Sequence, residues 1–375
     1  MKPLSNRKRL FILSDGKNPH TLKWVRGLAS EGYSIFLYSL SPFDPALYAA
    51  FPNVQMEHAH FDEKLKKSGD GALMKIQYLK VLLRVRELVR KFNPDIVHAH
   101  FASSYGLIGA LSGFHPFYIS VWGADVYDFP KKSFLHKCIL MFNLMKADRL
   151  FSTSFVMAEE TSQYTKKKID IIPFGVDVKR FSPQTMKHPM IPENHLVIGT
   201  VKSLEDKYGI TYLLEAFAIL KKRRPETPMK LLIVGRGTKE AKYKELAASL
   251  GIASDTIFTG FIPVEQVADY QNMIDIPVFP SILDSESFGV AVVEASSCAK
   301  PVIVSAKGGL KEVVEDGVSG IIIEAKDSSL IADAIIKLID NPELRKNYGT
   351  HGRERVMKLY DWQLNLKTMI NAYQD

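Results

Sequence analysis

Short apolar runs alternate with longer amphipathic segments along almost the whole chain. The runs are typical of buried strands, and the segments between them repeat their apolar positions with the period of a helix. The predicted helices include residues 20–32, 72–92, 210–224 and 239–250. This alternation indicates βαβ units and parallel sheets. The predicted strands cover residues 10–13, 34–38, 96–99, 117–121, 149–152, 169–172, 196–200, 230–234, 257–259, 276–279, 302–304 and 320–323.

A proline-containing segment divides this pattern in two. Residues 181–195, FSPQTMKHPMIPENH, hold three prolines and little apolar periodicity, which marks a linker. We expect an N-terminal domain over residues 1–185 and a C-terminal domain over residues 186–375, with the last helix, about residues 358–375, packing back on the first domain. Each would be a doubly wound α/β domain, in which ligands bind at the carboxyl ends of the strands. If the domains face each other, the cleft between them is the expected site.

The composition is that of a globular protein, with 46% hydrophobic and 24% charged residues. The only two cysteines, Cys138 and Cys298, show no metal-ligand spacing, which predicts a reducing, cytoplasmic location. The apolar run near the start is followed at once by polar residues, so we interpret it as a strand and not as a secretion signal. No run approaches the roughly 18 apolar residues of a membrane span.

The net charge of +8 is unevenly distributed. Residues 1–185 contain 26 Lys and Arg against 16 Asp and Glu, whereas the remainder contains 23 against 25. Residues 72–92 and 131–149 mix apolar with basic side chains. They fit either helices that cover a sheet and have a solvated face, or basic helices on the anionic inner face of the plasma membrane. The aromatic–basic interleaving of nucleic-acid modules is missing, so we expect no nucleic-acid partner.

The segment with the most chemistry is residues 279–305, FPSILDSESFGVAVVEASSCAKPVIVS. A short apolar strand is followed by a polar loop and then by an apolar helix. Glu286 and Glu294 are eight residues apart, which places one in the loop or first turn and the other two turns further along the helix. This spacing lets one acid bind a sugar and the other a ribose. It equally fits a first-turn acid that stabilises the helix dipole and an exposed helical acid.

ESFGVAVVE, from Glu286 to Glu294, resembles the E-x₇-E motif of glycosyltransferase family 4, a retaining family with the GT-B fold. PSILDSESFG and KPVIVSAKGGLKEVVEDGVSGIII resemble the segments that flank this motif in the family. IIPFGVDVKRF, LLIVGRG, FTGFIP and DIVHAHF resemble further family segments, in the same order. The similarity therefore covers most of the chain. It implies two Rossmann-like domains facing across a cleft, and a nucleotide-sugar donor.

The resemblance also implies roles for particular residues. Glu286 would bond the hydroxyls of the donor sugar, and Glu294 would hold those of the ribose. Ile262 would lie against the base, and Gly235 would let the chain pass close to the nucleotide, although a simple strand-to-helix turn explains Gly235 equally well. The expected donor-binding residues are Lys202, Ser203, Lys207, Gly235, Ile262, Ser281, Asp284, Phe288, Gly289, Val290 and Glu294.

The loop expected to bind the diphosphate departs from the family pattern. Breaking a glycosyl–diphosphate bond builds negative charge that cations stabilise, and family 4 usually supplies an Arg and a Lys in a Gly-Arg-Leu-x-x-x-Lys-Gly loop. Here the loop is VKSLEDKYG, with Ser203 at the Arg position and Tyr208 at the Lys position. Lys202 and Lys207 each lie one residue earlier. We expect them to take over; the alternative is that both are solvated loop lysines.

The predicted acceptor side lies in the first domain. FYISVWGADVYDFP resembles the family's His-Gly-x-Asp loop, with Trp122 where His is common. Trp cannot act as a base, but its flat ring offers a surface for a sugar. Asp125 would orient the acceptor or bond the donor sugar, so it joins Glu286 as a predicted catalytic residue. His20 and His100, near strand ends, complete this side. A core Trp, a capping Asp and structural histidines are the alternatives.

We therefore expect a hexosyltransferase. It would move a hexosyl or N-acetylhexosaminyl unit from a UDP-linked sugar to a glycan or a polyprenyl-linked saccharide, with retention, in the assembly of cell-surface polysaccharide or glycoconjugate. No metal-binding motif stands out, and the resemblance implies no cofactor and no required metal. A sugar-nucleotide epimerase of the same fold would instead convert the donor without an acceptor. A basic protein that binds membrane or nucleic acid would lack a nucleotide pocket.

Overall fold

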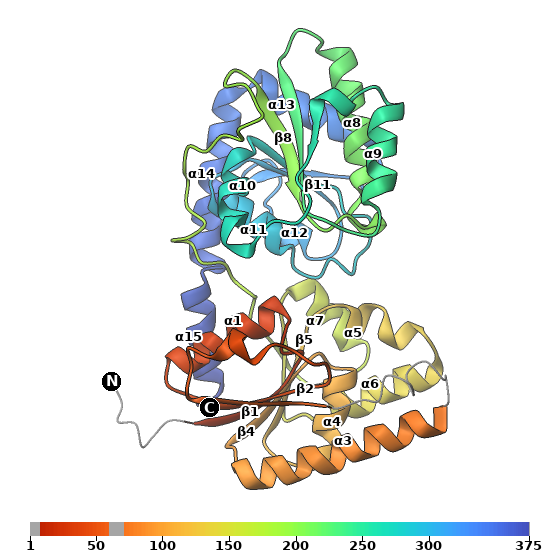
Figure 1. Cartoon of the computed structure of the whole chain (residues 1–375), viewed down its shortest axis with the longest axis vertical. Helices are drawn as coiled ribbons and strands as arrows, with labels where there is room; N and C mark the ends of the chain where they lie inside the picture. The colour runs from red at the N-terminus through yellow and green to blue at the C-terminus, as the bar shows by residue number, and fades with distance from the viewer. Residues whose placement is uncertain (1–7, 60–70, 375) are drawn as a thin grey trace. The chain divides into compact units, whose positions relative to one another are not determined.

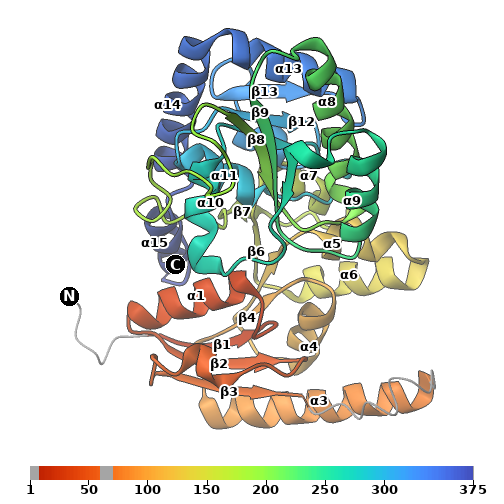
Figure 2. The same cartoon turned by 45° about the horizontal axis from the view of Figure 1, so that its top comes forward.

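The computed structural model describes residues 8–59 and 71–374 (Figures 1 and 2). The chain divides into two units, and each is described by itself. Unit 1 runs to Ile172 and includes Leu366–Asp375, and unit 2 is Pro173–Asn365. Within the predicted basic segment 72–92, the side chains of residues 72–78 lie outside the described residues.

Unit 1 is built on a parallel sheet of seven strands in the order β3-β2-β1-β4-β5-β6-β7. Helix α1 lies on one face of this sheet, and α3 and α4 lie on the other (Figures 1 and 2). The central strands are buried on both faces, which explains why they appear in the sequence as continuous apolar runs. The elements are β1 (Arg9–Leu13), α1 (Pro19–Ser30), β2 (Ser34–Ser39), η2 (Pro45–Tyr48), β3 (Val54–His58), α3 (Gly71–Phe92), β4 (Ile96–His100), α4 (Ser104–Ser112), β5 (Phe117–Val121), α5 (Ala124–Tyr127), η3 (Phe129–Lys131), α6 (Phe134–Lys146), β6 (Arg149–Ser152), α7 (Phe155–Ser162) and β7 (Ile169–Ile171).

Unit 2 is built on a parallel sheet of six strands in the order β10-β9-β8-β11-β12-β13. Helices α8, α9 and α13 pack together on one face, and α10, α11 and α14 pack on the other (Figure 1). The elements are β8 (Leu196–Val201), η4 (Asp206–Tyr208), α8 (Ile210–Arg223), β9 (Met229–Val234), α9 (Glu240–Ser249), η5 (Ala253–Asp255), β10 (Thr256–Phe258), η6 (Val264–Gln266), α10 (Val267–Met273), β11 (Ile276–Phe279), α11 (Val290–Ser297), β12 (Val302–Ser305), α12 (Leu310–Val313), β13 (Gly320–Ile323), α13 (Ser328–Asp340), α14 (Pro342–Leu359) and α15 (Trp362–Ala372).

Strand β3 is the one strand of the two sheets that the apolar pattern does not predict. It lies at the edge of its sheet and pairs with β2 alone. Of its five residues only Val54 is buried. An edge strand of this kind carries polar residues such as Gln55 and Glu57, so its sequence lacks the apolar run that reveals a central strand.

The division between the units falls after Ile172, ahead of the boundary expected between residues 185 and 186. The first residues of the expected linker pack within unit 2. The Ser297 hydroxyl donates to the Phe181 carbonyl at 2.6 Å, and the Asn272 side chain donates to the Ser182 carbonyl at 3.0 Å. These contacts join residues that are far apart in sequence, so proline content could not reveal them.

The end of the chain belongs to unit 1 from Leu366 onward. The Tyr373 side chain is fully buried, and its hydroxyl lies 2.7 Å from Nδ1 of His98 on β4. The Arg149 guanidinium donates to the Ala372 carbonyl at 2.8 Å. The turn that follows the last helix thus supplies a polar partner to a central strand of the first sheet.

Candidate active site

The candidate donor site lies at the topological switch point of the unit 2 sheet. From β8 the chain winds outward to β9 and β10, and from β11 it winds the other way to β12 and β13. Doubly wound sheets bind ligands outside the strand ends where the winding reverses. The loops that follow β8 and β11, residues 202–209 and 280–289, hold most of the predicted donor-binding residues.

A buried ion pair joins these two loops. Nζ of Lys202 lies 2.9 Å from Oε1 of Glu286, and the two side chains are only 16% and 11% exposed. Burial lowers the pKa of Lys202, but the charge of Glu286, followed by those of Tyr208 and Glu294, outweighs burial and raises that pKa above its usual value. Lys202 is therefore a cation at neutral pH, fixed beside the predicted sugar-binding carboxylate.

Tyr208 lies between the two predicted lysines. The ammonium groups of Lys202 and Lys207 lie 4.5 Å and 4.8 Å from the centre of its ring, which is cation–π distance. The residue that replaces the family's lysine thus holds the two neighbouring cations on its ring.

A hollow of about 620 Å³ opens beside this loop, a size within the range of small-molecule sites. Ser203 and Lys207 line it, together with Arg236 and Thr238 from the loop after β9. The Arg236 guanidinium lies 4.5 Å from the centre of the Phe261 ring. Arg236 is not among the residues predicted from the sequence, although a cation between two glycines at a strand end was a usable signal.

Two glycines after β12 hold in place the loop of residues 280–289, which we call the acidic loop because it carries Asp284 and Glu286. The Gly309 N–H donates to the Glu286 carbonyl at 2.9 Å, and the Gly308 N–H donates to Oδ1 of Asp284 at 3.2 Å. A Cβ at Gly308 would lie 2.3 Å from the Glu286 carbonyl oxygen, so no larger residue fits without moving the loop. Of the other loop residues, Asp284 is exposed, and Ser281 is buried with its carbonyl accepting from Ser305.

Helix α11 begins at the end of the acidic loop. Its N-cap, Gly289, has φ of +81° and makes no side-chain capping bond, so the first N–H groups of the helix receive no cap from it. Phe288 is buried against the rings of Phe174 and Tyr360 and anchors the loop. Glu294, further along α11, is half-buried and lies 3.5 Å from the Gln271 side-chain nitrogen.

Of the other three predicted donor residues, Val290 is the first residue of α11, and Gly235 and Ile262 follow β9 and β10. Gly235 has φ of +131°, and a Cβ there would lie 2.2 Å from the Lys202 carbonyl oxygen. Glycine is therefore required for the close approach of two loops. Ile262 is half-buried and packs against a small apolar cluster that includes Val197 and Val234.

The predicted acceptor residues of unit 1 meet in a row of rings at the switch point of the first sheet, between β1 and β4. The Trp122 ring lies 6.0 Å from that of His20 and 4.7 Å from that of His100, between centroids. His100 is buried, its Nδ1 makes no hydrogen bond, and burial lowers its pKa to about 3. It is therefore a neutral ring at physiological pH.

Asp125 is fully buried beneath this row. Its carboxylate accepts hydrogen bonds from the backbone N–H groups of Ala102 at 2.6 Å, Gly123 at 2.8 Å and Trp122 at 3.1 Å. Burial raises the pKa of Asp125, and these N–H groups offset part of that effect. The geometry is that of a residue that shapes the Trp122 loop, and a direct catalytic role for Asp125 stays a prediction.

The described residues contain neither a cluster of side chains that could hold a metal ion nor a helix that could cross a membrane. Among residues 8–59 and 71–374, no group of three or more His, Cys, Asp or Glu side chains is placed to hold a metal ion. Over the same residues, every helix falls short of the length and apolarity needed to cross a bilayer.

Comparison with protein families identifies both halves of the chain. Residues 9–154 match the model described as glycosyl transferase 4-like, and residues 182–355 match the model described as glycosyl transferases group 1. The chain belongs to glycosyltransferase family 4. As a family 4 enzyme it transfers a sugar from a nucleotide sugar.

Two relatives of this family 4 enzyme have names that indicate different acceptors. The chain is 26% identical over 366 residues to N-acetyl-alpha-D-glucosaminyl L-malate synthase of Bacillus anthracis, covering 92% of this chain and 89% of that protein. It is 31% identical over 219 residues to D-inositol 3-phosphate glycosyltransferase of Corynebacterium jeikeium, which is 55% of this chain and only 52% of that protein.

Solved structures confirm the predicted GT-B fold of two Rossmann-like domains. Sucrose-phosphate synthase from Thermosynechococcus elongatus matches with a TM-score of 0.82 at 20% identity, over 98% of both chains. The Anabaena protein HepE in complex with UDP matches with a TM-score of 0.80 at 17% identity, over 98% of this chain and 99% of that one. At these identities the likeness establishes the fold alone.

Proposed function

We propose that this enzyme transfers a hexosyl or N-acetylhexosaminyl unit from a UDP-linked sugar to a glycan or a lipid-linked saccharide, with retention of the anomeric configuration. Unit 2 would bind the donor, and unit 1 would present the acceptor. The place of the reaction would be the assembly of cell-surface polysaccharide or glycoconjugate.

The observation that carries the proposal is the Lys202–Glu286 ion pair at the switch point of unit 2. A donor of this class has sugar hydroxyls, which a carboxylate accepts well, and a diphosphate, which a lysine neutralises. The two side chains are in direct contact, in loops that lie close to the start of α11, whose N-cap is Gly289. Lys207 and the helix N-terminus would share the negative charge that develops on the leaving diphosphate.

The chemical step follows from these positions. The bond between the anomeric carbon and the diphosphate oxygen breaks, and the acceptor hydroxyl forms its bond to that carbon on the same face. The leaving phosphate oxygen takes the acceptor's proton, so the enzyme needs no separate base on that face. Glu286 orients the donor sugar, Glu294 holds the ribose, and the backbone of Phe288, Gly289 and Val290 contacts the sugar and diphosphate.

Two similar proteins support UDP as the nucleotide and an N-acetylhexosamine as one sugar to test. The Anabaena protein of the same fold was solved with UDP, and the Bacillus anthracis relative is named for an N-acetylglucosaminyl product. The two curated relatives differ in acceptor, which fits an acceptor side set by loops that vary within one fold.

The test is nucleotide release from a panel of UDP-, GDP- and ADP-sugars, with and without a mixture of glycan acceptors. We expect release from UDP-sugars that depends on the acceptor, and a loss of about 10²- to 10³-fold in Glu286→Ala, because a preorganised charged contact to the donor is removed. Glu343→Ala, an exposed acid on α14, is the matched control.

Three outcomes would contradict the proposal in different ways. Unchanged turnover in Glu286→Ala would remove this residue from the mechanism. Conversion of the donor to an isomer without nucleotide release would indicate an epimerase. Absence of any melting-temperature shift with UDP, GDP or ADP would remove the nucleotide site itself, since a ligand that binds only the folded state raises stability.

A further inference from the structure

Helix α6 of unit 1 presents apolar side chains on two opposite faces. Leu140 and Leu144 are fully buried in the core of unit 1, where α6 packs against α4. On the other face Phe134 is 82% exposed and Met145 is 60% exposed, with Met141 between them also exposed. A helix that covers a sheet needs only one apolar face, so the second face is unexplained by the fold of the described residues.

The exposed Phe134, Met141 and Met145 form one stripe along the helix, together with the half-buried Cys138. Residues 134, 138, 141 and 145 follow each other at intervals of four, three and four, which places them on the same side of an α-helix. Leu135 widens the stripe at the start of the helix, and Phe155, which is 70% exposed, begins the next helix α7. Exposed aromatic and long apolar side chains gathered in this way mark a contact site.

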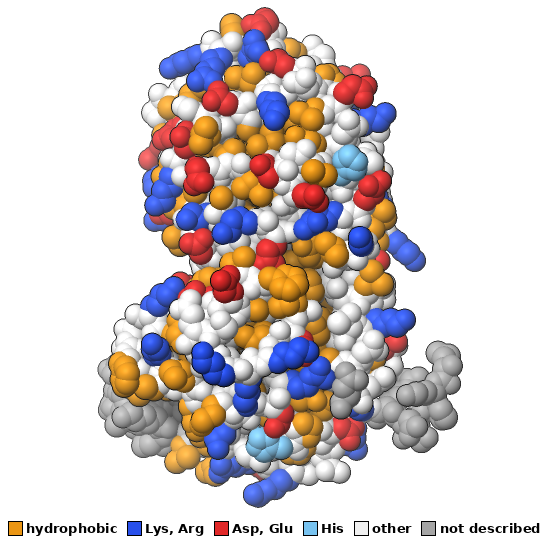
Figure 3. All heavy atoms as spheres, turned by 180° about the vertical axis from the view of Figure 1, so that it is seen from behind, with side chains coloured by type: hydrophobic (Ala, Val, Ile, Leu, Met, Phe, Trp, Pro, Cys, Tyr) orange, Lys and Arg blue, Asp and Glu red, His pale blue; other side chains and the backbone are white. Residues whose placement is uncertain are grey.

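The charged side chains of α6 and of the residues just before it have one sign. Residues 131–146 contain four lysines, Lys131, Lys132, Lys137 and Lys146, and no Asp or Glu. All four side chains are exposed, although Lys131 reaches Glu160 at 3.3 Å. On the face drawn in Figure 3, the surface of unit 1 carries lysine, arginine, aspartate and glutamate side chains among hydrophobic ones.

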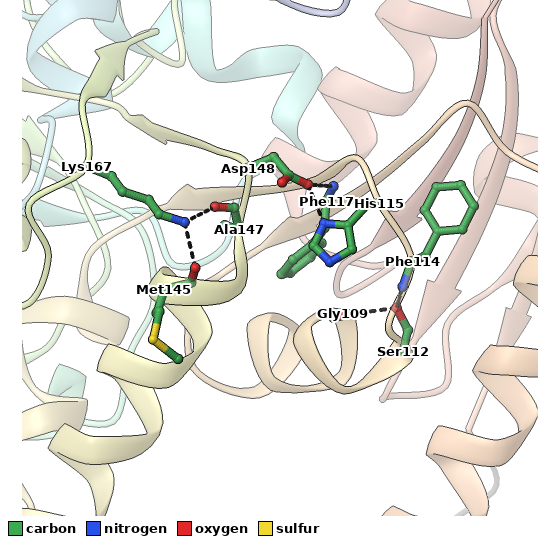
Figure 4. Close-up of polar contacts among 9 residues, drawn as sticks. All are labelled: Gly109, Ser112, Phe114, His115, Phe117, Met145, Ala147, Asp148 and Lys167. Atoms are coloured by element: carbon green, nitrogen blue, oxygen red, sulfur yellow. Dashed lines mark hydrogen bonds and ion pairs between the residues drawn. The ribbon is translucent and has the colours of Figure 1, made fainter.

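Three further lysines, at positions 166–168, follow α7, and the middle one, Lys167, lies at the carboxyl end of α6. Lys167 ties the two segments together, because its ammonium donates to the carbonyl of Met145 at 2.6 Å and to that of Ala147 (Figure 4). Lysines therefore stand at both ends of the apolar stripe and along it.

We propose that the α6 stripe docks unit 1 on an anionic lipid surface. Apolar side chains flanked by lysines match the two properties of such a surface, an apolar interior and negative headgroups. A second copy of this chain would bring the same lysines against each other, so charge disfavours that occupant. The proposal goes beyond the proposed transfer reaction and does not depend on it.

The first experiment measures binding of the full chain to vesicles by co-sedimentation, with no nucleotide sugar present. We expect binding to vesicles of phosphatidylcholine and phosphatidylglycerol in equal parts, and little binding to phosphatidylcholine alone. Phe134→Ser combined with Met145→Ser should weaken the partition coefficient about tenfold or more, because two large apolar side chains no longer enter the lipid. Met190→Ser, which changes a residue of unit 2 that is 66% exposed, should leave it unchanged.

The second experiment separates the lysines from the apolar stripe. Lys132→Gln, Lys137→Gln and Lys146→Gln together should reduce binding by roughly fivefold per lysine at low salt and by less at high salt, where charges are screened. Lys222→Gln on unit 2 is the control. The variants should keep the melting-temperature shift with UDP, which separates a failure of docking from a failure of the donor site.

Several results would overturn the proposal. Wild-type protein that does not sediment with anionic vesicles would do so, as would stripe variants that bind as strongly as wild type. Analytical ultracentrifugation provides a further test. If the wild type is a dimer and Phe134→Ser with Met145→Ser is a monomer, the stripe serves self-association instead.

Discussion

The two sheets of this chain reverse their winding at equivalent places, yet the loops there carry opposite chemistry. In unit 2 the switch point holds a cation and a carboxylate, Lys202 and Glu286, in direct contact. In unit 1 it holds a row of rings around Trp122, with a neutral His100 in the row and Asp125 turned into the protein beneath it.

This difference shows how one topology supplies two functions. The strand order fixes where a ligand can bind, and it does so in the same way in both units. The loop residues then decide what binds. A charged pair favours a donor with hydroxyls and phosphates, whereas uncharged rings favour the faces of sugar rings.

Breaking the ion pair should have the largest effect. In Lys202→Met a buried Glu286 carboxylate loses its cation, so we expect a loss of about 3 kcal/mol in the free energy of unfolding and about 10²-fold in turnover. Lys202→Met with Glu286→Gln should regain most of the stability, because no buried charge is left unpaired, but none of the activity. Urea unfolding and nucleotide release measure the two quantities.

Lys222→Met, at an exposed position on α8, is the control for this experiment. If Lys202→Met unfolds at the same urea concentration as wild type, the pair does not hold the two loops together. If the double variant recovers turnover, the pair is structural and the comparison between the two switch points fails.

The rings of unit 1 should make its stability depend on pH. Burial lowers the pKa of His100 to about 3 and also lowers that of His98. Below the ordinary histidine value of about 6.5 the unfolded chain binds protons that the folded chain does not, so stability falls as pH falls through this window. From pH 7.5 to pH 5 the loss is about 2 kcal/mol per buried histidine.

His100→Phe tests this origin of the pH dependence. Nδ1 of His100 has no hydrogen-bond partner, so the substitution removes a titrating group without breaking a bond at that atom. We expect a shallower decline in stability toward pH 5, measured by urea unfolding and tryptophan fluorescence. The exposed His351→Phe should not change the decline, and an equal decline in His100→Phe would rule out this residue as its source.

Sequence alone predicts the fold well, because burial on both faces of a parallel sheet leaves a continuous apolar run for each central strand. Edge strand β3 is not predicted, because its side chains are mostly polar. The boundary after Ile172 could not be read from the sequence, because Phe181 and Ser182 are held by partners about a hundred residues away. Tertiary contacts of this kind leave no trace in local composition.

The candidate site divides in the same way. The spacing of Glu286 and Glu294 and the presence of Lys202 and Lys207 are visible in sequence. The contact between Lys202 and Glu286 is not, because it joins loops 84 residues apart that only the sheet order brings together. Arg236 was missed, and the burial of Asp125 under three backbone N–H groups could not be read from its motif.

A substitution of Trp122 tests whether the rings of unit 1 bind the acceptor while unit 2 binds the donor. We expect Trp122→Ala to raise the KM for the best acceptor of the panel about tenfold, because a ring face worth roughly 1 kcal/mol or more beyond its area is lost. The melting-temperature shift with UDP should not change, since the donor residues belong to unit 2. A lost UDP shift with an unchanged acceptor KM would reverse the roles assigned to the two units.

Substitutions of Tyr208 should have the smallest effect, a modest change in UDP binding that distinguishes the role of the ring from that of the hydroxyl. Its ring faces both Lys202 and Lys207, and cation–π contacts contribute about 0.5–2 kcal/mol each. Tyr208→Leu should therefore weaken UDP binding about threefold to tenfold, because the two ammonium groups lose the surface that positions them. Tyr208→Phe keeps the ring face and should bind UDP within about twofold of wild type. Calorimetric titration with UDP measures both. If Phe and Leu weaken binding equally, the hydroxyl of Tyr208 matters and its ring does not, and the contact with Glu286 is what positions Lys202.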